Sequence, residues 1–118
     1  MSQILIIQDS PSINTLLKFK LESAGFNVDT AETGEEGLEK IKGASYHLVL
    51  LDIGLPGIDG REVYRILRKE INGDIPVLFL SAQDDLKLAQ IVDETGANGY
   101  ISISASQEEM TEKIKEYV

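Results

Sequence analysis

Apolar runs alternate with turn-forming residues in a pattern that predicts five strand–helix units. The predicted strands are residues 3–8, 27–31, 46–51, 77–80 and 100–103. Three of them contain runs that are apolar throughout, which is typical of parallel strands buried on both faces. The second and fifth strands carry polar residues, so we expect them at the two edges of the sheet.

Helix signals follow the predicted strands. Pro11 is well placed for the first turn of a helix. Thr33 with Glu36, and Ser106 with Glu109, have the spacing of capping boxes. The apolar positions that recur at helical spacing are Ile13, Leu16, Leu17 and Leu21; Leu38 and Ile41; Val63, Ile66 and Leu67; Leu88, Ile91 and Val92; and Met110, Ile114 and Tyr117.

Five such units predict an α/β fold with a doubly wound, five-stranded parallel sheet and helices on both faces. With the continuously apolar strands in the centre, the pattern favours the order 2-1-3-4-5 of flavodoxin-like (βα)5 folds. A chain of 118 residues without repeats or linkers is expected to form a single domain over residues 1–118.

Composition excludes several classes of protein. The net charge is −9 with no basic stripe, so direct binding of nucleic acid is not expected. No apolar run approaches the roughly 20 residues of a membrane span, and no signal peptide is recognisable. The chain has no cysteine, which excludes disulfides and thiolate metal sites. We expect a cytoplasmic location.

Two aspartates end apolar runs of predicted central strands. Asp9 follows residues 4–7, and Asp52 follows residues 48–51 and precedes a loop rich in glycine and proline. Open α/β sheets bind ligands at the carboxyl ends of their strands. Two acids delivered to one crevice form a candidate site for Mg2+, and one of them is a candidate nucleophile.

Four segments in order, residues 4–12, 50–60, 79–82 and 96–100, resemble the receiver domain of two-component response regulators over essentially the whole chain. The resemblance implies that Asp52 accepts a phosphoryl group from a histidine kinase or phosphotransfer protein. It implies that Mg2+ is bound by Asp9, Asp52 and the carbonyl of Gly54. Ser81 would then contact a phosphoryl oxygen, and Tyr100 would be the aromatic switch residue.

The same resemblance implies a signalling module and not an enzyme, apart from slow autodephosphorylation. Its downstream protein target would bind the face formed by the fourth helix, fifth strand and fifth helix. A phosphatase with an aspartyl nucleophile is disfavoured because Gly54 stands where such enzymes commonly place a second Asp. A flavin-binding protein is disfavoured because Asp9 and Pro11 occupy the loop where a phosphate needs free N–H groups.

The chain departs from the family pattern at two positions. Gln8 stands where the family has the first of two acids, and Ile103-Ser104 stands where it has Lys-Pro. Losing one acid and the lysine together leaves the pocket charge at −2, so we regard Gln8 and Ile103 as a compensated pair. The bond after Ile103 is expected to be trans, since it is not an X-Pro bond. A pseudo-receiver that acts by binding alone remains the alternative.

Other assignments stay open for single residues. Asp9 could instead cap the first helix, because aspartate is common at that position. Tyr100 could be an ordinary half-buried residue of an edge strand. His47 is interpreted as a surface or structural residue, and Lys87 as a solvated helix charge that does not replace the absent lysine.

The compensated pair predicts non-additive effects on stability. Gln8→Asp alone or Ile103→Lys alone should lower the free energy of unfolding, because each leaves a charge without its counterpart. The double variant should lose less than the sum of the two. Urea unfolding of the four proteins measures the coupling, and additive losses would show that the two positions are independent.

Overall fold

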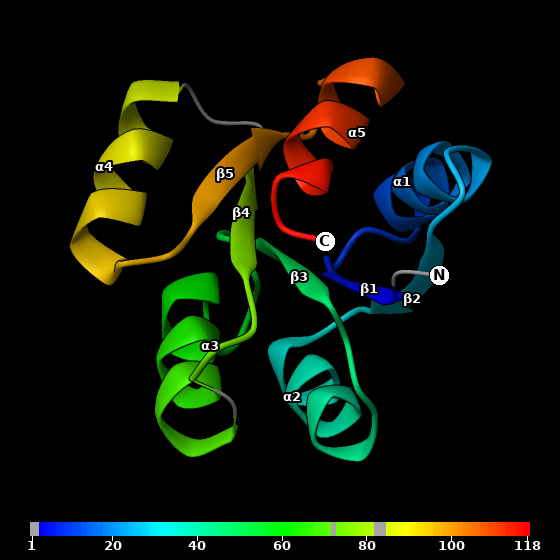
Figure 1. Cartoon of the computed structure of the whole chain (residues 1–118). Coiled ribbons are helices and arrows are strands. Elements are labelled where there is room, and N and C mark those ends of the chain that lie inside the picture. Colours follow the sequence, from blue (N-terminus) through cyan, green and yellow to red (C-terminus); the bar gives the residue numbers. More distant parts are fainter. Residues whose placement is uncertain (1–2, 72, 82–84) are drawn as a thin grey trace.

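The computed structural model describes residues 3–71, 73–81 and 85–118 of the chain (Figure 1). Strands and helices alternate in the predicted sequence. The elements are β1 (Gln3–Ile7), α1 (Pro11–Ser23), β2 (Asn27–Ala31), α2 (Gly34–Gly43), β3 (Leu48–Asp52), α3 (Gly60–Ile66), η1 (Leu67–Ile71), β4 (Val77–Ser81), α4 (Asp85–Thr95), β5 (Gly99–Ser102) and α5 (Gln107–Lys115).

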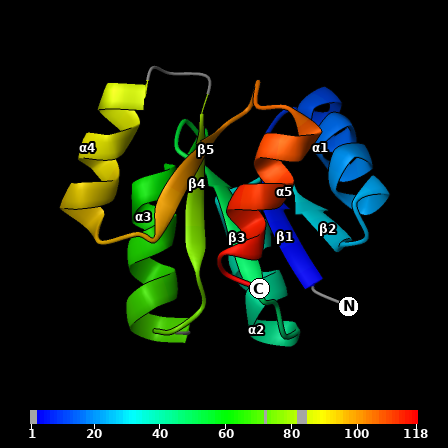
Figure 2. The ribbon, with the colours of Figure 1, turned by 45° about the horizontal axis from the view of Figure 1, so that its top comes forward.

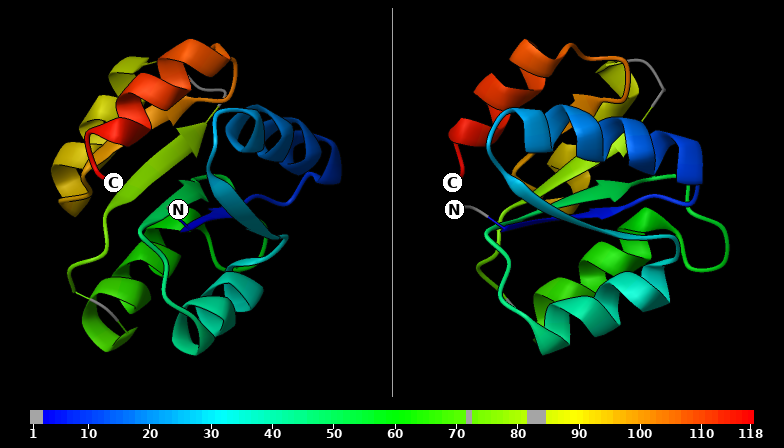
Figure 3. Two further views of the ribbon diagram at one scale, coloured as in Figure 1. Left: turned by 45° about the vertical axis from the view of Figure 1, so that its right-hand side comes forward. Right: turned by 90° about the vertical axis from the view of Figure 1, so that its right-hand side faces the viewer.

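The five strands form one parallel sheet in the order β2-β1-β3-β4-β5, so the predicted topology and both edge strands are confirmed. The helices cover both faces, as Figure 3 shows for α1 and α5 on one side and α2 and α3 on the other. α4 packs beside β4 and the edge strand β5 (Figure 2). Because parallel strands alternate their side chains, each face of the sheet has its own apolar cluster.

The cluster under α1 and α5 contains Ile4 and Ile6 of β1, and the other cluster contains Leu5 and Ile7. All four side chains are fully buried. At helix α1 the core side is formed by Asn14, Leu17 and Leu21, whereas Leu16 is largely exposed although it follows the helical spacing. The pattern therefore predicted the helix correctly but not every buried position on it.

Strand boundaries differ from the prediction where side chains bond to the backbone. β5 ends at Ser102, so Ile103 lies outside the strand in which it was placed. The Ser102 hydroxyl accepts a hydrogen bond from the Ser104 N–H at 3.2 Å, and the Ser102 carbonyl accepts one from Ala105 at 3.1 Å. These bonds close a turn directly after the strand. Asp52, in contrast, is the last residue of β3 itself.

One predicted capping box is complete and the other is not. Ser106 and Glu109 bond reciprocally at 3.1 Å in each direction at the start of α5. Thr33 caps α2 by accepting from the Glu36 N–H at 3.0 Å. A complete capping box would also have a bond from the Thr33 N–H to the Glu36 carboxylate. That carboxylate instead accepts from the Glu32 N–H at 2.9 Å, so this part of the prediction was wrong.

The pattern did not predict the π-helical turn η1 that continues α3. Arg68 in this turn donates to the Ile75 carbonyl at 2.8 Å and lies over the Tyr64 ring, 4.9 Å from its centroid. It thereby joins the helix to the segment that enters β4. Among the described residues, no helix is both long enough and apolar enough to cross a bilayer.

Gly60 allows α3 to begin against the end of β3. A Cβ at this position would lie 2.4 Å from the Asp52 carbonyl oxygen and 2.7 Å from the Ile53 Cα, both backbone atoms that cannot move independently. Gly60→Ala should therefore lower the free energy of unfolding by about 1–3 kcal/mol, measured in urea. Gly43→Ala is the matched control, because nothing lies within 4 Å of its Cβ.

The control should leave the stability unchanged or raise it by up to about 1 kcal/mol, since alanine is the better helix former. Equal stabilities of the Gly60→Ala and Gly43→Ala proteins would show that the close approach at β3 does not constrain this position.

Candidate functional site

The candidate site lies at the carboxyl edge of the sheet, where β1 and β3 are neighbours. Residues Ile4 to Ile7 pair in register with Leu48 to Leu51, so the residues that follow the two runs meet at the same level. Asp52 ends β3 with only 8% of its surface exposed, and Ile53 continues the pairing by donating to the Leu80 carbonyl at 3.2 Å. The strand therefore holds the Asp52 carboxylate in a fixed place.

The structure brings the predicted acids Asp9 and Asp52 together. Asp9 is exposed, and its carboxylate is close enough to that of Asp52 for a direct side-chain interaction. Burial raises the pKa of Asp52 above its usual range, and the negative charge of Asp9 raises it further. The Gly54 N–H and the Gln8 amide act in the opposite direction, because hydrogen bonds to the carboxylate favour its charged form.

Gly54 contacts Asp52 through its backbone. Its N–H donates to Asp52 Oδ1 at 3.2 Å, across the first turn of the loop after β3. Gly54 has no side chain and is exposed, so the loop is open to solvent at this point. Gly54 thus lies beside Asp52, and its place in a magnesium site stays a prediction.

Gln8 is a buried part of the site, with only 2% of its surface exposed. Its side-chain Oε1 accepts a hydrogen bond from the Ser10 N–H at 3.2 Å, and its amide interacts with the Asp52 carboxylate. Its backbone is fixed as well, since its carbonyl accepts from Asn14 Nδ2 at 2.7 Å and its N–H donates to Ala31 at 3.0 Å. Gln8 therefore connects β1, β2, α1 and β3.

Sequence reasoning gave no role to Asn14, although a signal was present. Asn14 precedes Leu17 and Leu21 by three and seven residues, which puts a polar residue on the core side of α1. A buried amide on such a stripe needs a hydrogen-bond partner, and here that partner is the Gln8 carbonyl.

Ser81 and Tyr100 lie on the neighbouring strands β4 and β5. Ser81 is the last residue of β4 and is 3% exposed; it lies one residue beyond Leu80, the register partner of Asp52. Tyr100 pairs with Phe79 in the sheet and packs, half-buried, against the apolar cluster under α2, α3 and α4. Residue 82 of the family-like segment lies outside the described residues.

The Ile103 side chain contributes no polar group to the site. Its side chain is partly buried against the apolar cluster under α1 and α5, and its N–H donates to the Ser81 carbonyl at 3.1 Å. None of the described peptide bonds is cis, so the prediction of a trans bond before Ser104 is confirmed. The loop before α5 is also bound to α1, because the Lys20 ammonium donates to the Ala105 carbonyl at 3.2 Å.

The alternative role of Asp9 as a helix cap is wrong. The N-cap of α1 is Ser10, whose hydroxyl accepts from the Ile13 N–H at 3.3 Å. His47 is exposed and its Nδ1 accepts from the Gln3 N–H at 2.9 Å, which agrees with its interpretation as a surface or structural residue. Lys87 lies exposed on α4.

The donor set at this edge fits Mg2+. Within the described part of the chain no cluster of three metal-ligating side chains exists, so the acids available are Asp9 and Asp52. Mg2+ is commonly held by one or two carboxylates together with water. Two facing carboxylates, one of them buried and with a raised pKa, form an arrangement in which a divalent cation relieves the repulsion.

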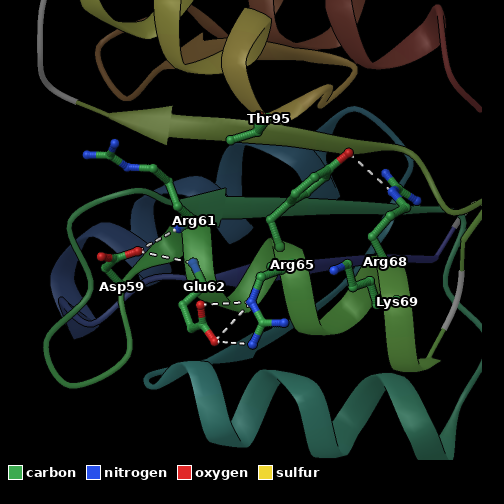
Figure 4. Close-up of a pocket in the computed structure, with 8 residues that line it drawn as sticks. Asp59, Arg61, Glu62, Arg65, Arg68, Lys69 and Thr95 are labelled. Atoms are coloured by element: carbon green, nitrogen blue, oxygen red, sulfur yellow. Dashed lines mark hydrogen bonds and ion pairs between the residues drawn. The ribbon is translucent and has the colours of Figure 1, made fainter.

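A groove of about 690 Å3 runs along α3 on a different surface (Figure 4). Basic residues line it, but two of them are bonded within the fold: Arg65 pairs with Glu62, and Arg68 donates to the Tyr64 hydroxyl. Neither aspartate of the edge site lines this groove. We therefore assign the candidate chemistry to the sheet edge and not to the groove.

A family model described as the response regulator receiver domain matches residues 4–115. The chain belongs to the response regulator receiver family. The receiver resemblance of the sequence is thereby confirmed, and the fold agrees with it. The chemotaxis protein CheY4 of Vibrio cholerae superimposes with a TM-score of 0.90 at 25% identity, covering 100% of this chain and 99% of CheY4.

Closer relatives in sequence include the alkaline phosphatase synthesis transcriptional regulatory protein PhoP of Bacillus subtilis, 37% identical over 96% of this chain and 47% of PhoP. The response regulator ArlR of Staphylococcus aureus is 33% identical over 98% of this chain and 52% of ArlR. The chain thus spans about half the length of these two relatives.

The response regulator TrrA of Thermotoga maritima is 37% identical, and its structure in complex with Mg2+-BeF superimposes with a TM-score of 0.88. The alignment covers 100% of both chains. TrrA also has a solved structure in complex with the histidine kinase ThkA, which matches with the same TM-score over 100% of this chain and 99% of TrrA.

The raised pKa of Asp52 predicts a pH-dependent stability. An acid whose folded pKa lies above its unfolded value favours the unfolded state as soon as the unfolded form ionises. The cost is absent below the unfolded pKa and grows as pH rises toward the folded value. Without Mg2+, Asp52→Asn should be more stable than the wild type at pH 7, and the difference should vanish near pH 3.

Urea unfolding in the presence of a chelator at the two pH values measures this difference. Asp93→Asn, an exposed change on α4, is the control and should alter stability little at either pH. A stabilisation by Asp52→Asn of the same size at both pH values would contradict an origin in the ionised carboxylate.

Proposed function

We propose that this receiver accepts a phosphoryl group on Asp52 and thereby changes a protein-binding surface. The observation that carries the proposal is the direct approach of Asp9 to the buried Asp52 carboxylate at the end of β3. A carboxylate held by a strand, with one open side at a loop, is placed to act as a nucleophile.

The chemistry follows from the nature of phosphoryl transfer, which requires positioning and charge neutralisation more than covalent assistance. An Asp52 oxygen would form a bond to phosphorus while the bond from phosphorus to the donor nitrogen breaks, and the donor imidazole keeps the electron pair. The Gly54 N–H, already 3.2 Å from Asp52 Oδ1, holds the carboxylate in orientation.

Asp9, Asp52 and the Gly54 carbonyl would hold Mg2+, which supplies positive charge against the approaching phosphoryl group. The protein's own part is to keep the two carboxylates together in spite of their repulsion. It does so by placing Asp52 at the end of β3 and Asp9 two residues after the end of the adjacent parallel strand β1. That TrrA, at 37% identity, was solved with Mg2+-BeF supports this assignment.

Ser81 and Tyr100 are proposed to transmit the event. The Ser81 hydroxyl is a donor at the end of β4, next to the strand that carries Asp52. Tyr100 packs only partly into the core from the adjacent edge strand β5, where its register partner is Phe79 of β4, so a change at the end of β4 would act on its packing. Such coupling is a local charge event that biases a packed element.

The proposed phosphodonor is a histidine kinase or phosphotransfer protein, as the complex of TrrA with ThkA supports. α1 starts at the site and carries two exposed apolar side chains, Leu16 and Phe19, of which Phe19 is 71% exposed. These residues offer the donor an apolar contact on α1. The downstream target is proposed to bind the surface of α4, β5 and α5.

A pseudo-receiver that binds partners without phosphorylation is the second candidate. It is favoured by Ile103, whose side chain packs into the apolar cluster and cannot donate to a phosphoryl group. A charge-assisted contact of the kind that a lysine would provide contributes roughly 1.5–3 kcal/mol. Its absence weakens either the transfer itself or the response to it.

Intact mass after incubation with acetyl phosphate and Mg2+ distinguishes the two candidates. We expect the wild type to gain about 80 Da, the mass of one phosphoryl group, and Asp52→Ala to gain nothing. A gain by both proteins would place the phosphoryl group elsewhere. If the folded wild type gains no mass with acetyl phosphate, and none when the experiment is repeated with a histidine kinase as donor, the pseudo-receiver is favoured.

A further inference from the structure

The groove along α3 is a basic surface on an acidic protein. Its lining contains four cations and two carboxylates and so carries a net charge of +2, whereas the whole chain carries −9. Arg61, Arg65 and Lys69 are exposed and follow one another at intervals of four residues, which in a helix is about 6 Å along one side. Figure 4 shows Arg61 at one end of the groove and Lys69 toward the other. The three cations therefore form a row, here called the basic row, and do not converge on one point.

The basic row is only weakly bound within the fold. Arg61 and Lys69 have no ion pair among the described residues, and Arg65 pairs with Glu62 of the same helix. Both side chains of that pair are well exposed, and surface pairs of this kind contribute little to stability. A guanidinium has more N–H donors than one carboxylate can accept, so Arg65 can bind a second acid. The fourth cation, Arg68, is bonded to the fold and is not part of the row.

The basic row ends in the π-helical turn η1, to which Lys69 belongs. Turns of this kind are rare and occur frequently at functional sites. The site at the sheet edge gives η1 no role, because that site adjoins Gly60 at the opposite end of α3. A binding surface along α3 would include this turn.

A row of acids with the same spacing lies on α5. Glu108, Glu112 and Glu116 are exposed and are also four residues apart; they are here called the acidic row. They line a hollow of about 470 Å3, in which four carboxylates and one ammonium give a net charge of −3. In the part of the chain that the structure describes, none of the three has an ion pair. The two rows thus match in spacing and are opposite in charge.

The two rows cannot meet within one molecule. α3 covers one face of the sheet and α5 covers the other (Figure 3). Each row must therefore find its counterpart on a second molecule. A two-fold dimer would have to bring both pairs of rows together at once, which rows on opposite faces do not allow. The contact is therefore of the head-to-tail kind, in which different surfaces of the two copies meet.

We propose that the basic row of one molecule binds the acidic row of a second copy, so that this receiver associates head to tail. The inference goes beyond the proposed function and does not rest on phosphorylation of Asp52. Exposed ion pairs are individually weak, and the two copies carry the same net charge. The contact is therefore reversible, with an expected Kd on the order of 1 mM.

The experiment is sedimentation equilibrium of the unphosphorylated protein at concentrations up to about 1 mM and an ionic strength of about 0.15 M. Arg61→Glu/Lys69→Glu reverses the ends of the basic row, and Glu112→Lys/Glu116→Lys reverses two members of the acidic row. We expect the average mass of the wild type to rise with concentration. In each variant alone, the association constant should fall by at least about tenfold.

A mixture of the two variants tests the head-to-tail geometry. The first variant keeps the acidic row and the second keeps the basic row, so the mixture should associate although neither variant does so alone. General attraction does not explain such a result, because both variants remain net negative. Lys18→Glu/Lys42→Glu is the matched control, since it makes the same charge change on exposed positions of α1 and α2. It should keep the wild-type association constant within about twofold.

Four results would overturn the proposal. A wild type that stays monomeric would do so, and the basic row would then be a surface for an acidic segment of another protein. Association that persists in either variant alone would place the contact elsewhere. A control that loses association as strongly as Arg61→Glu/Lys69→Glu would indicate general repulsion, and a mixture that does not associate would exclude the pairing of the two rows.

Folding of each variant is checked by circular dichroism. If Arg61→Glu/Lys69→Glu does not fold, Arg61→Ala/Lys69→Ala takes its place, since it removes the two charges without adding acids. The same loss of association and the same recovery in the mixture are then expected.

Discussion

The buried carboxylate of Asp52 beside Asp9 is the constraint on which the site depends. The two neighbouring negative charges oppose folding, and burial of the Asp52 carboxylate adds to the free-energy cost, as the raised pKa of Asp52 indicates. The surrounding structure offsets this cost with neutral donors, the Gly54 N–H and the Gln8 amide. Gly60 in turn lets the start of α3 approach the backbone of Asp52 and Ile53, because a Cβ at this position would collide with both residues.

The architecture could be predicted because it follows from where apolar residues must go. Continuous apolar runs such as residues 48–51 are stable only between two helical layers, and polar strands only at edges. Element ends were less predictable, because they depend on single bonds such as that from the Ser104 N–H to the Ser102 hydroxyl. The π-helical turn depends on contacts of Arg68 with Tyr64 and Ile75, which no local pattern specifies.

Of the site, too, some features could be predicted from the sequence and others could not. The proximity of Asp9 and Asp52 could be predicted, since parallel strands that are neighbours end at the same edge. The part of Gln8 could not, because a residue at a strand end gives no sign of which neighbour its amide will reach. Asn14 was detectable as a polar residue on an apolar stripe, but its partner, the Gln8 carbonyl, is defined only by the packing of α1 on the sheet.

Ile103 shows how the fold fills the position at which the resemblance implies a lysine side chain. Its side chain packs on the cluster under α1 and α5, so an apolar group stands where the resemblance implies a lysine. With Gln8 in place of an acid, the neutral pair keeps the site charge at the value of the two remaining aspartates. An added phosphoryl group would then find fewer opposing charges than in a site with a lysine. Its neutralisation would then rest on a cation between Asp9 and Asp52 and on the Ser81 hydroxyl.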